Sequence, residues 1–434
     1  MANKTPNFTG TTIAAVVAIA YWIVGSLCWS MASVHTQSAP VWLSAGVVFG
    51  ALLVAPQGRW AAVLIGAIVA SYVWGLTAHG LDALAAAPFA LIEVVSIAAG
   101  AWIARRAMDG STHGVSVAGW LICGAMVTAG LGATLAAEFW RWQRPGVLYS
   151  VEWRAWGFST LVGILLAAPV VQVFRGFKVK RSGGMPMMQF AAGSAVFLVF
   201  LAVAITVFGA NDEERFGTLA ATLGYLPMPF LLLSAMIWGP RGGALAMLTG
   251  SLLVIGLTAG GGGPFMVSEG FVGEAVIEVQ AYVAVWTALM VLARSLSESR
   301  REAWTQAREW QLRYERILGA TGTASVEFDA VTGAATWDEQ AATVLGREIW
   351  SLRGITDWHA RINTSDRARA EAAWQAVARG QQSTDRSLYP VRLGQQEITV
   401  EAQLAAVRGP DGAVEYVAGL LRPVDNARGA NHHG

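Results

Sequence analysis

Residues 283–293 read VAVWTALMVLA and residues 294–302 read RSLSESRRE, so the chain turns from apolar to charged within a few helical turns. The same division extends outward in both directions, because 25 of residues 1–294 are charged against 34 of residues 295–434. About a quarter of an average soluble protein is charged. The second part matches that level and the first falls well below it. We therefore predict a membrane-embedded body followed by a water-soluble module.

The composition of the whole chain excludes several classes of protein. Of its 434 residues, 54% are hydrophobic and 14% are charged, which excludes a uniform globular enzyme, a disordered chain and a fibrous repeat. The formal charge of +1 gives no basic surface for nucleic acid, so we expect no nucleic-acid partner. Cys28 and Cys123 lie in apolar stretches, where cysteine is usually a small hydrophobe, and we expect no metal site.

The first part contains a series of apolar runs. A transmembrane helix needs roughly 20 mostly apolar residues. Three of the runs are short, so we predict a polytopic α-helical membrane domain of about ten transmembrane helices, with eight spans plus re-entrant pieces as the alternative. The runs are Thr11–Met31, Val41–Val54, Trp60–Leu76, Pro88–Ile103, Val115–Ala137, Trp156–Phe174, Met188–Phe208, Tyr225–Trp238, Ala244–Leu257 and Val272–Leu292.

The basic residues predict the orientation of these spans. Cytoplasmic loops collect Lys and Arg. With the N-terminus inside, ten of the Lys and Arg residues up to Arg294 fall in inner segments and four in outer ones. We therefore predict a multi-pass membrane protein, with the lipid bilayer as its partner and both termini cytoplasmic. Many of the 19 tryptophans lie near span ends, and we interpret them as anchors at the headgroup level.

Glu93 is a carboxylate inside an apolar run. Such a group costs about 2.5–3.5 kcal/mol on the insertion scale and is a functional candidate for that reason. One interpretation is a carboxyl group that is neutralised, or paired with an inner-face Arg, for helix packing. The other is a group that senses a ligand or a proton. Gly260–Gly263 precedes Pro264 without the Lys-Ser/Thr of a phosphate-binding loop, so we interpret it as a span-ending turn.

Several segments of the first part resemble one family. The run APVWLSAG at 39–46 resembles the Pro-Val-Trp-x-x-Ala-Gly signature of the membrane-associated sensor domain of the first type, the MASE family. The runs WGFSTLVGILLAAP at 156–169 and IWGPRGGA at 237–244, the loop 260–265 and Gln280 follow in the order usual for that family. Glu93 stands where members often have Glu, and Thr160 stands where they commonly carry Asp. The resemblance covers about residues 10–295.

This resemblance implies that residues 1–294 form an integral membrane sensor domain. It also marks the positions that we take as candidates for ligand binding or sensing. They are Trp42, Ser44, Gly46, Glu93, Thr160, Pro169, Trp238, Arg241 and Gln280.

Residues 295–318 are predicted to form a linker helix, because neither Pro nor Gly occurs before Gly319. Five residues in it are spaced 4-3-4-3, a seam of period 3.5. We interpret the segment either as a dimeric signalling helix or as an amphipathic helix folded against the next domain, since two heptads do not prove a coiled coil. We expect a homodimer through this helix and the module after it. The seam consists of Ala303, Ala307, Trp310, Tyr314 and Ile317.

Residues 319–424 are predicted to form an α+β domain, and residues 425–434 a disordered tail. A hairpin turn is expected at 330–333, with Gly333 supplying positive φ, and a helix is expected over 365–378 with Ser365 as its N-cap. The other predicted helix covers 339–345, and the predicted strands cover 324–329, 334–337, 386–392, 398–407 and 414–422.

This module resembles a PAS domain, through FDAVTGAATW at 328–337 and WHARINTSDR at 358–367. It departs from the family at Asn363-Thr364, where His-Pro is usual, and at 422–425, which reads RPVD where the family usually ends in Asp-Val/Ile-Thr. The resemblance implies a module that passes a signal onward.

Residues 295–434 contain no Cys, which excludes a cysteine-dependent flavin photoreceptor and an iron–sulfur cluster. We expect no cofactor, including no haem on His359.

The sequence contains no phosphoacceptor helix, ATPase motif or cyclase signature, and no catalytic constellation, so we expect no enzyme. We predict a signal-transduction sensor in which the membrane domain senses a ligand or a membrane state. The PAS domain would relay this to a separate kinase or diguanylate cyclase, or the chain would be the sensory half of a longer protein. The alternative is a small-solute transporter with a regulatory PAS domain, since the spans near Gly46 and 260–264 look interrupted.

Overall fold

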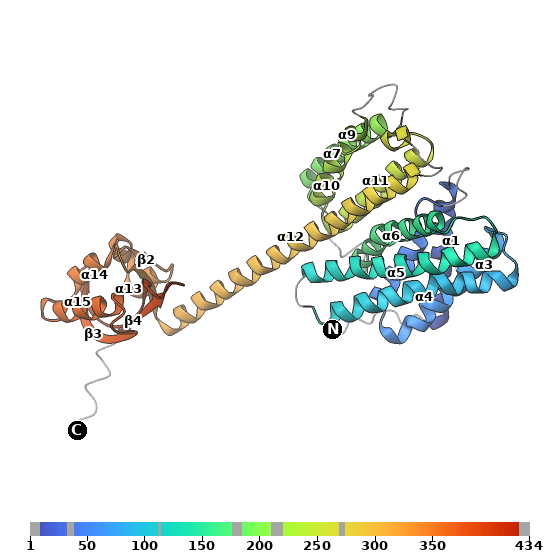
Figure 1. The fold of residues 1–434 in the computed structure, drawn as a ribbon. Coiled ribbons are helices and arrows are strands. Elements are labelled where there is room, and N and C mark those ends of the chain that lie inside the picture. The colour runs from blue at the N-terminus through green and yellow to red at the C-terminus, as the bar shows by residue number, and fades with distance from the viewer. Residues whose placement is uncertain are drawn as a thin grey trace. The chain divides into compact units, whose positions relative to one another are not determined.

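The computed structural model describes residues 9–32, 39–111, 114–175, 185–209, 220–268 and 274–424. The chain divides into two compact units, Met1–Arg300 and Arg301–Gly434 (Figure 1), and each is considered by itself. The predicted tail at 425–434 lies outside the described residues, as do Lys4 and the basic residues Lys178, Lys180 and Arg181.

The first unit is built from helices. Eight helices in the described part of the chain are long and apolar enough to cross a membrane, whereas α2 and α10 have only 12 and 11 residues. Eight of the ten predicted runs are therefore helices of membrane-spanning length, and the other two are shorter apolar helices. The helices are α1 (Gly10–Ser30), α2 (Leu43–Val54), α3 (Trp60–Thr77), α4 (Ala83–Asp109), α5 (Gly114–Gln143), α6 (Tyr149–Val173), α7 (Met187–Phe208), α9 (Ala220–Leu223), α10 (Pro227–Ile237), α11 (Gly239–Ala259) and α12 (Glu274–Thr321).

Contacts between helix ends define two opposite faces of this unit. At the first, called face A, the rings of Trp29 and His79 lie 5.1 Å apart where α1 and α3 end, and His79 lies 5.4 Å from the Trp140 ring near the end of α5. At the second, called face B, Arg105 near the end of α4 donates hydrogen bonds to the carbonyl oxygens of Leu52 and Ala55, where α2 ends. The short helix α2 therefore carries the chain from face A back to face B.

The second half of the unit continues the alternation. Gln189 at the start of α7 donates to the carbonyl oxygen of Ile237 at the end of α10, and Arg241 donates to that of Val173 at the end of α6. The short helix α10 thus returns the chain to face B, as α2 does. At face B, Gly114 at the start of α5 lies beside Ser295 of α12. The ten predicted apolar runs therefore alternate in direction.

Helices α2 and α6 pack with their backbones almost in contact. A Cβ atom on Gly46 would lie 2.1 Å from the carbonyl oxygen of Gly163, and one on Gly163 would lie 2.0 Å from that of Trp42. Small residues allow such an approach in membranes, where packing rather than exclusion of water drives the association of helices. Gly46 therefore holds α2 against α6.

The second unit contains a five-stranded antiparallel sheet in the order β2-β1-β5-β4-β3, with helices packed against it (Figure 1). Its core includes Phe328, Trp358 and Val417, each at most 2% exposed. The predicted α+β fold is confirmed, and the sheet resembles that of a PAS domain. The strands are β1 (Ala324–Asp329), β2 (Ala335–Trp337), β3 (Thr384–Leu393), β4 (Gln396–Arg408) and β5 (Val414–Val424), and the α-helices after α12 are α13 (Ala341–Leu345), α14 (Ile355–Arg361) and α15 (Thr364–Ala378).

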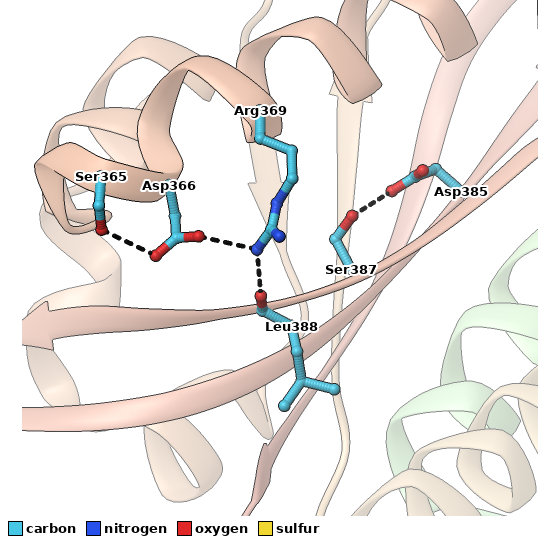
Figure 2. A network of polar contacts seen from close by, with 6 residues as sticks. All are labelled: Ser365, Asp366, Arg369, Asp385, Ser387 and Leu388. Carbon is cyan, nitrogen blue, oxygen red and sulfur yellow. Dashed lines mark hydrogen bonds and ion pairs between the residues drawn. The ribbon is translucent and has the colours of Figure 1, made fainter.

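The start of α15 differs from the prediction. Asn363, not Ser365, is the N-cap residue, and no side chain caps the helix. The prediction of Ser365 as the N-cap is therefore wrong. Its hydroxyl instead donates to Asp366 at 3.1 Å (Figure 2). Arg369 donates both to Asp366 and to the carbonyl oxygen of Leu388, each at 2.8 Å, which ties α15 to β3. On β3 itself, the Ser387 hydroxyl donates to Asp385 at 2.7 Å.

The contact between α2 and α6 gives a test of the packing. We expect Gly163→Ala to lower the thermal unfolding temperature of the full chain in detergent, because its Cβ would displace a backbone carbonyl and overpacking typically costs about 1–3 kcal/mol. Gly130→Ala on α5 is the control, because nothing lies within 4 Å of its Cβ position. Equal unfolding temperatures of the two variants would contradict this packing.

Candidate ligand-sensing site

Glu93 lies inside α4 and is only 4% exposed. The Tyr21 hydroxyl of α1 donates to its Oε2 at 2.6 Å, and the Ser71 hydroxyl of α3 donates to the same oxygen at 2.5 Å. The indole Nε1 of Trp42 donates to Oε1 at 2.5 Å. Three neutral donors from separate segments therefore share one carboxyl group.

An inner-face Arg is not among the partners of Glu93 in the described part of the chain. Arg105, which lies on the same helix, instead donates to the backbone carbonyls that end α2. The interpretation of Glu93 as a neutralised or Arg-paired carboxyl group therefore stays a prediction, and no Arg pairs with it among the described residues. A hydrogen bond contributes about 0.5–1.5 kcal/mol net, so the three bonds tie α1, α3, α4 and the start of α2 together.

The extended segment 39–42, which precedes α2, is held on two sides. The backbone N–H of Trp42 donates to the carbonyl oxygen of Ser159 at 3.0 Å, and the Ser159 hydroxyl donates to the carbonyl oxygen of Ala39 at 3.0 Å. Gln280 of α12 donates through Nε2 to the carbonyl oxygen of Pro40 at 2.5 Å. Backbone that is neither helix nor sheet needs such partners at membrane depth. The segment thus joins α6 to α12.

A cavity of about 100 Å³ opens at face A beside this segment. Six of its lining residues are aromatic and come from α1, α4, α5, α6 and the chain around α2 and α3. Their rings meet mostly edge to face, as in the pair Phe89–Trp156 at 5.8 Å. The aromatic lining residues are Trp29, Trp42, His79, Phe89, Trp140 and Trp156, and the polar ones are Arg144, Glu152, Ser159 and Thr160.

The cavity contains both signs of charge. The Arg144 guanidinium lies over the Trp140 ring, 4.5 Å from its centre, which is a cation–π contact. Glu152 lies in the first turn of α6, and among the described residues it forms no ion pair with Arg144. Burial, aided by the charge of Arg144, lowers the pKa of His79 to about 4, so its imidazole is neutral near pH 7.

Trp42 belongs to both features. Its ring lines the cavity, while its indole N–H donates to Glu93. Ser44 lies on the next turn, and its hydroxyl donates to the carbonyl oxygen of Tyr21 at 2.9 Å. Thr160 is buried and lines the cavity, and Gln280 holds the segment that carries Trp42. Five of the predicted residues, including Glu93, therefore form one connected site.

Gly46 and three other predicted residues make contacts outside this connected site. Pro169 lies within α6 and lines a second cavity of about 250 Å³, whose lining also includes Arg294 and Glu298. Trp238 donates to the carbonyl oxygen of Phe190 at 3.3 Å. Arg241 donates to the end of α6, as described above. These three do not line the cavity at face A.

Most of the residues around Trp42 could not be identified from the sequence alone. Tyr21 and Ser71 stand 72 and 22 positions from Glu93, so no local spacing connects them to it. The tryptophans of the cavity do share a recognisable position in the sequence, because they lie near span ends. That position was interpreted as membrane anchoring. Arg144 and Glu152 were not among the predicted site residues.

The five seam residues of the predicted linker all belong to α12 and are all exposed, with Trp310 at 70%, Tyr314 at 52% and Ile317 at 62%. Tyr314 also lines a groove of about 510 Å³ together with β-sheet residues such as Arg386 and Gln403. The two interpretations of the linker therefore both remain predictions.

The core of the C-terminal unit contains a cavity of about 10 Å³, lined by residues that include Trp358, His359 and Tyr389. Such a space is on the scale of one water molecule. His359 is buried, and burial lowers its pKa, while the Trp358 indole donates to the Tyr389 hydroxyl at 3.3 Å. The absence of a cofactor stays a prediction.

The model of the MASE1 family matches residues 11–301, about two thirds of the chain. The protein belongs to the MASE1 family. The match contains the whole cavity, Glu93 and the first part of α12, and it confirms the resemblance drawn from the sequence. No curated protein matches the chain.

Solved structures similar to part of this MASE1 protein come from sensory proteins. A domain of the putative light and redox sensing histidine kinase from Haloarcula marismortui is 20% identical, covering 26% of this chain and 97% of that one, with a TM-score of 0.22. A sensory box histidine kinase/response regulator from Burkholderia thailandensis is 22% identical over 26% and 84% of the two chains, with a TM-score of 0.22. An RNA-binding light-oxygen-voltage receptor is 19% identical over 23% and 29%, with a TM-score of 0.21.

Replacing Glu93 tests the shared carboxyl group. We expect Glu93→Gln to lower the unfolding temperature of the full chain, because an amide has one acceptor oxygen and leaves a buried donor unpaired at a cost of about 1–3 kcal/mol. Glu278→Gln on α12 is the matched control, since Glu278 is exposed. If Glu93→Gln unfolds at the same temperature as the control, the three hydrogen bonds do not hold these helices.

The lowered pKa of His79 predicts that the stability of the fold depends on pH. Its pKa of about 4 lies below the usual 6.5, so between these values the unfolded chain binds more protons than the folded one. The contribution of neutral His79 to the free energy of unfolding is complete above about pH 6.5 and is lost as the pH falls toward about 4. We expect His79→Gln to weaken the pH dependence of the unfolding temperature over this range. Identical pH profiles of the variant and the natural chain would contradict the burial of a neutral imidazole.

Proposed function

We propose that this MASE1 protein is a signal-transduction sensor of the bacterial inner membrane. A ligand in the cavity at face A alters the hydrogen bond between Trp42 and Glu93. Helix α12 transmits the change, and the PAS-like unit passes it to a separate kinase or diguanylate cyclase. The observation that carries this proposal is that Trp42 both lines the cavity and donates to Glu93.

The route from the cavity to α12 is short. Trp42 ends the segment 39–42, and Gln280 donates to the carbonyl oxygen of Pro40 within that segment. Helix α12 runs without a break from Glu274 to Thr321, and strand β1 begins at Ala324. A displacement of the segment therefore acts directly on the helix that leads out of the first unit.

The basic residues of the two faces support the proposed orientation. Among the described residues up to Arg294, face B holds twice as many Arg side chains as face A, which supports a cytoplasmic face B. The cavity then faces the periplasm and both chain ends face the cytosol. Face B carries Arg59, Arg105, Arg106, Arg175, Arg241 and Arg294, and face A carries Arg141, Arg144 and Arg154.

The exposed seam of α12 supports a homodimer. Trp310 and Ile317 are large apolar side chains that stand in solvent in the single chain. A second copy of the same helix would cover them along a seam of period 3.5. The dimer would then pass a rotation or a shift of α12 to the PAS-like units of both copies.

Disulfide crosslinking tests the relay. In a chain carrying Cys28→Ser and Cys123→Ser, we expect Ala307→Cys to crosslink in membranes much more than Thr305→Cys, which lies on the opposite side of the helix. Adding Trp42→Phe keeps a ring in the cavity wall but removes the N–H that binds Glu93. We expect it to change the crosslinked fraction at Ala307→Cys by about twofold or more.

Two outcomes would count against the relay. Equal crosslinking at both positions would reject the dimeric seam, and a crosslinked fraction that ignores Trp42→Phe would reject coupling from the cavity. Flux of a solute into proteoliposomes without linker crosslinks would favour the alternative of a transporter with a regulatory PAS domain.

A further inference from the structure

The two charged residues of the cavity at face A stand without a mutual ion pair. Glu152 is half-buried, its carboxylate has no hydrogen-bond partner among the described residues, and the Arg144 guanidinium lies over the Trp140 ring. Their charges are near enough to influence each other. An anion and a cation that share a cavity in this way present two separate binding points of opposite charge.

The aromatic walls favour one kind of cation. The faces of indole and phenyl rings attract weakly hydrated cations, and cages of several aromatic side chains recognise quaternary ammonium groups. Four tryptophans line this cavity, together with Phe89 and His79. The low pKa of His79, caused by burial, keeps its imidazole uncharged near pH 7, so it does not repel a cation. A carboxylate beside such walls strengthens the preference for a positive group.

The size and polarity of the cavity restrict the ligand further. About 100 Å³ admits a small molecule only. A bare cation would leave Arg144 unmatched, and a bare anion would leave Glu152 unmatched. A molecule that carries both charges a short distance apart matches both and adds no net charge.

We propose that this cavity binds a small zwitterion of the betaine type. Its quaternary ammonium group contacts the tryptophan rings and Glu152, and its carboxylate binds Arg144. This inference rests on the proposed function, since it names the ligand class of the same sensing site. Ser159 and Thr160 lie on the wall nearest the segment 39–42, so an occupied cavity contacts the element that carries Trp42.

Binding to the full chain in detergent or nanodiscs tests the ligand class. The probes are glycine betaine, choline, which lacks the carboxylate, and 3,3-dimethylbutanoate, in which carbon replaces the ammonium nitrogen. Tryptophan fluorescence follows the titrations. We expect saturable binding of glycine betaine, with a dissociation constant about tenfold or more below those of the other two. No saturable binding, or equal affinity for all three, would overturn the inference.

Charge variants assign the two binding points. We expect Glu152→Gln and Arg144→Gln each to weaken glycine betaine binding about tenfold. Glu138→Gln and Arg141→Gln are the matched controls, because Glu138 and Arg141 form an exposed ion pair on α5 at 3.4 Å and do not line the cavity. Control affinities within about twofold of the natural chain are expected. An equal loss in variants and controls would reject the two assigned positions.

A second comparison keeps the test valid if a variant folds poorly. Arg144→Gln should not weaken the binding of choline, because choline has no carboxylate to lose and is relieved of a like charge. Glu152→Gln should for the same reason not weaken that of 3,3-dimethylbutanoate. If Arg144→Gln instead weakens choline as much as glycine betaine, the carboxylate of the ligand does not bind Arg144 and the proposed pose is wrong.

The crosslinking assay separates this inference from the relay. Saturable glycine betaine binding that leaves the Ala307→Cys crosslinks unchanged supports the site and contradicts the proposed relay. Crosslinks that respond to Trp42→Phe in a protein that does not bind glycine betaine support the relay and overturn the betaine site.

Discussion

The burial of the Glu93 carboxyl group in an apolar helix bundle is the constraint on which the rest of the first unit depends. A carboxyl group in such surroundings needs hydrogen-bond partners, and an unmatched one carries a large desolvation cost. The donors Tyr21, Ser71 and Trp42 meet that need, and they come from three other segments of the chain. Their convergence fixes the indole of Trp42, whose ring also lines the cavity. The hydrogen bonds of this one carboxyl group therefore help to shape the wall of the cavity.

Much of this architecture could be predicted because its signals are local. Apolar runs predict helices, and the switch in composition near residue 294 predicts two units. Glu93 stands out because a carboxylate in a span is costly at any position. Gly333 was predicted as a turn residue and has φ of 71°, since the chemistry of a hairpin turn is contained in a few neighbouring residues. Helix and strand bounds in the C-terminal unit came close for the same reason.

The composition of the site could not be predicted, because it depends on which faces of distant helices meet. Tyr21 and Glu93 are 72 residues apart, and a helix that is apolar all round carries no periodic signal that marks the side facing its neighbour. The cavity tryptophans show a second cause. Their position at span ends is equally compatible with anchoring in lipid headgroups and with lining a concave site. Ser365 failed as an N-cap because Asn363 precedes the helix, and Ser365 hydrogen-bonds to Asp366.

The contacts that the segment 39–42 makes with α6 differ in rigidity from those it makes with α12. In the proposed relay, this difference indicates where a ligand would act. On the side of α6 the segment and α2 pack backbone to backbone through Gly163, which leaves no room for sliding. On the side of α12 a single side chain, Gln280, makes the hydrogen bond to Pro40, and its buried Oε1 has no partner in the described part of the chain. An unpaired buried acceptor costs about 1–3 kcal/mol, which an arrangement that pairs it would recover. A ligand shifts an equilibrium only through a difference in affinity between two states. In the proposed relay, the interface with α12 is therefore the place where a modest difference in ligand affinity would move the helix.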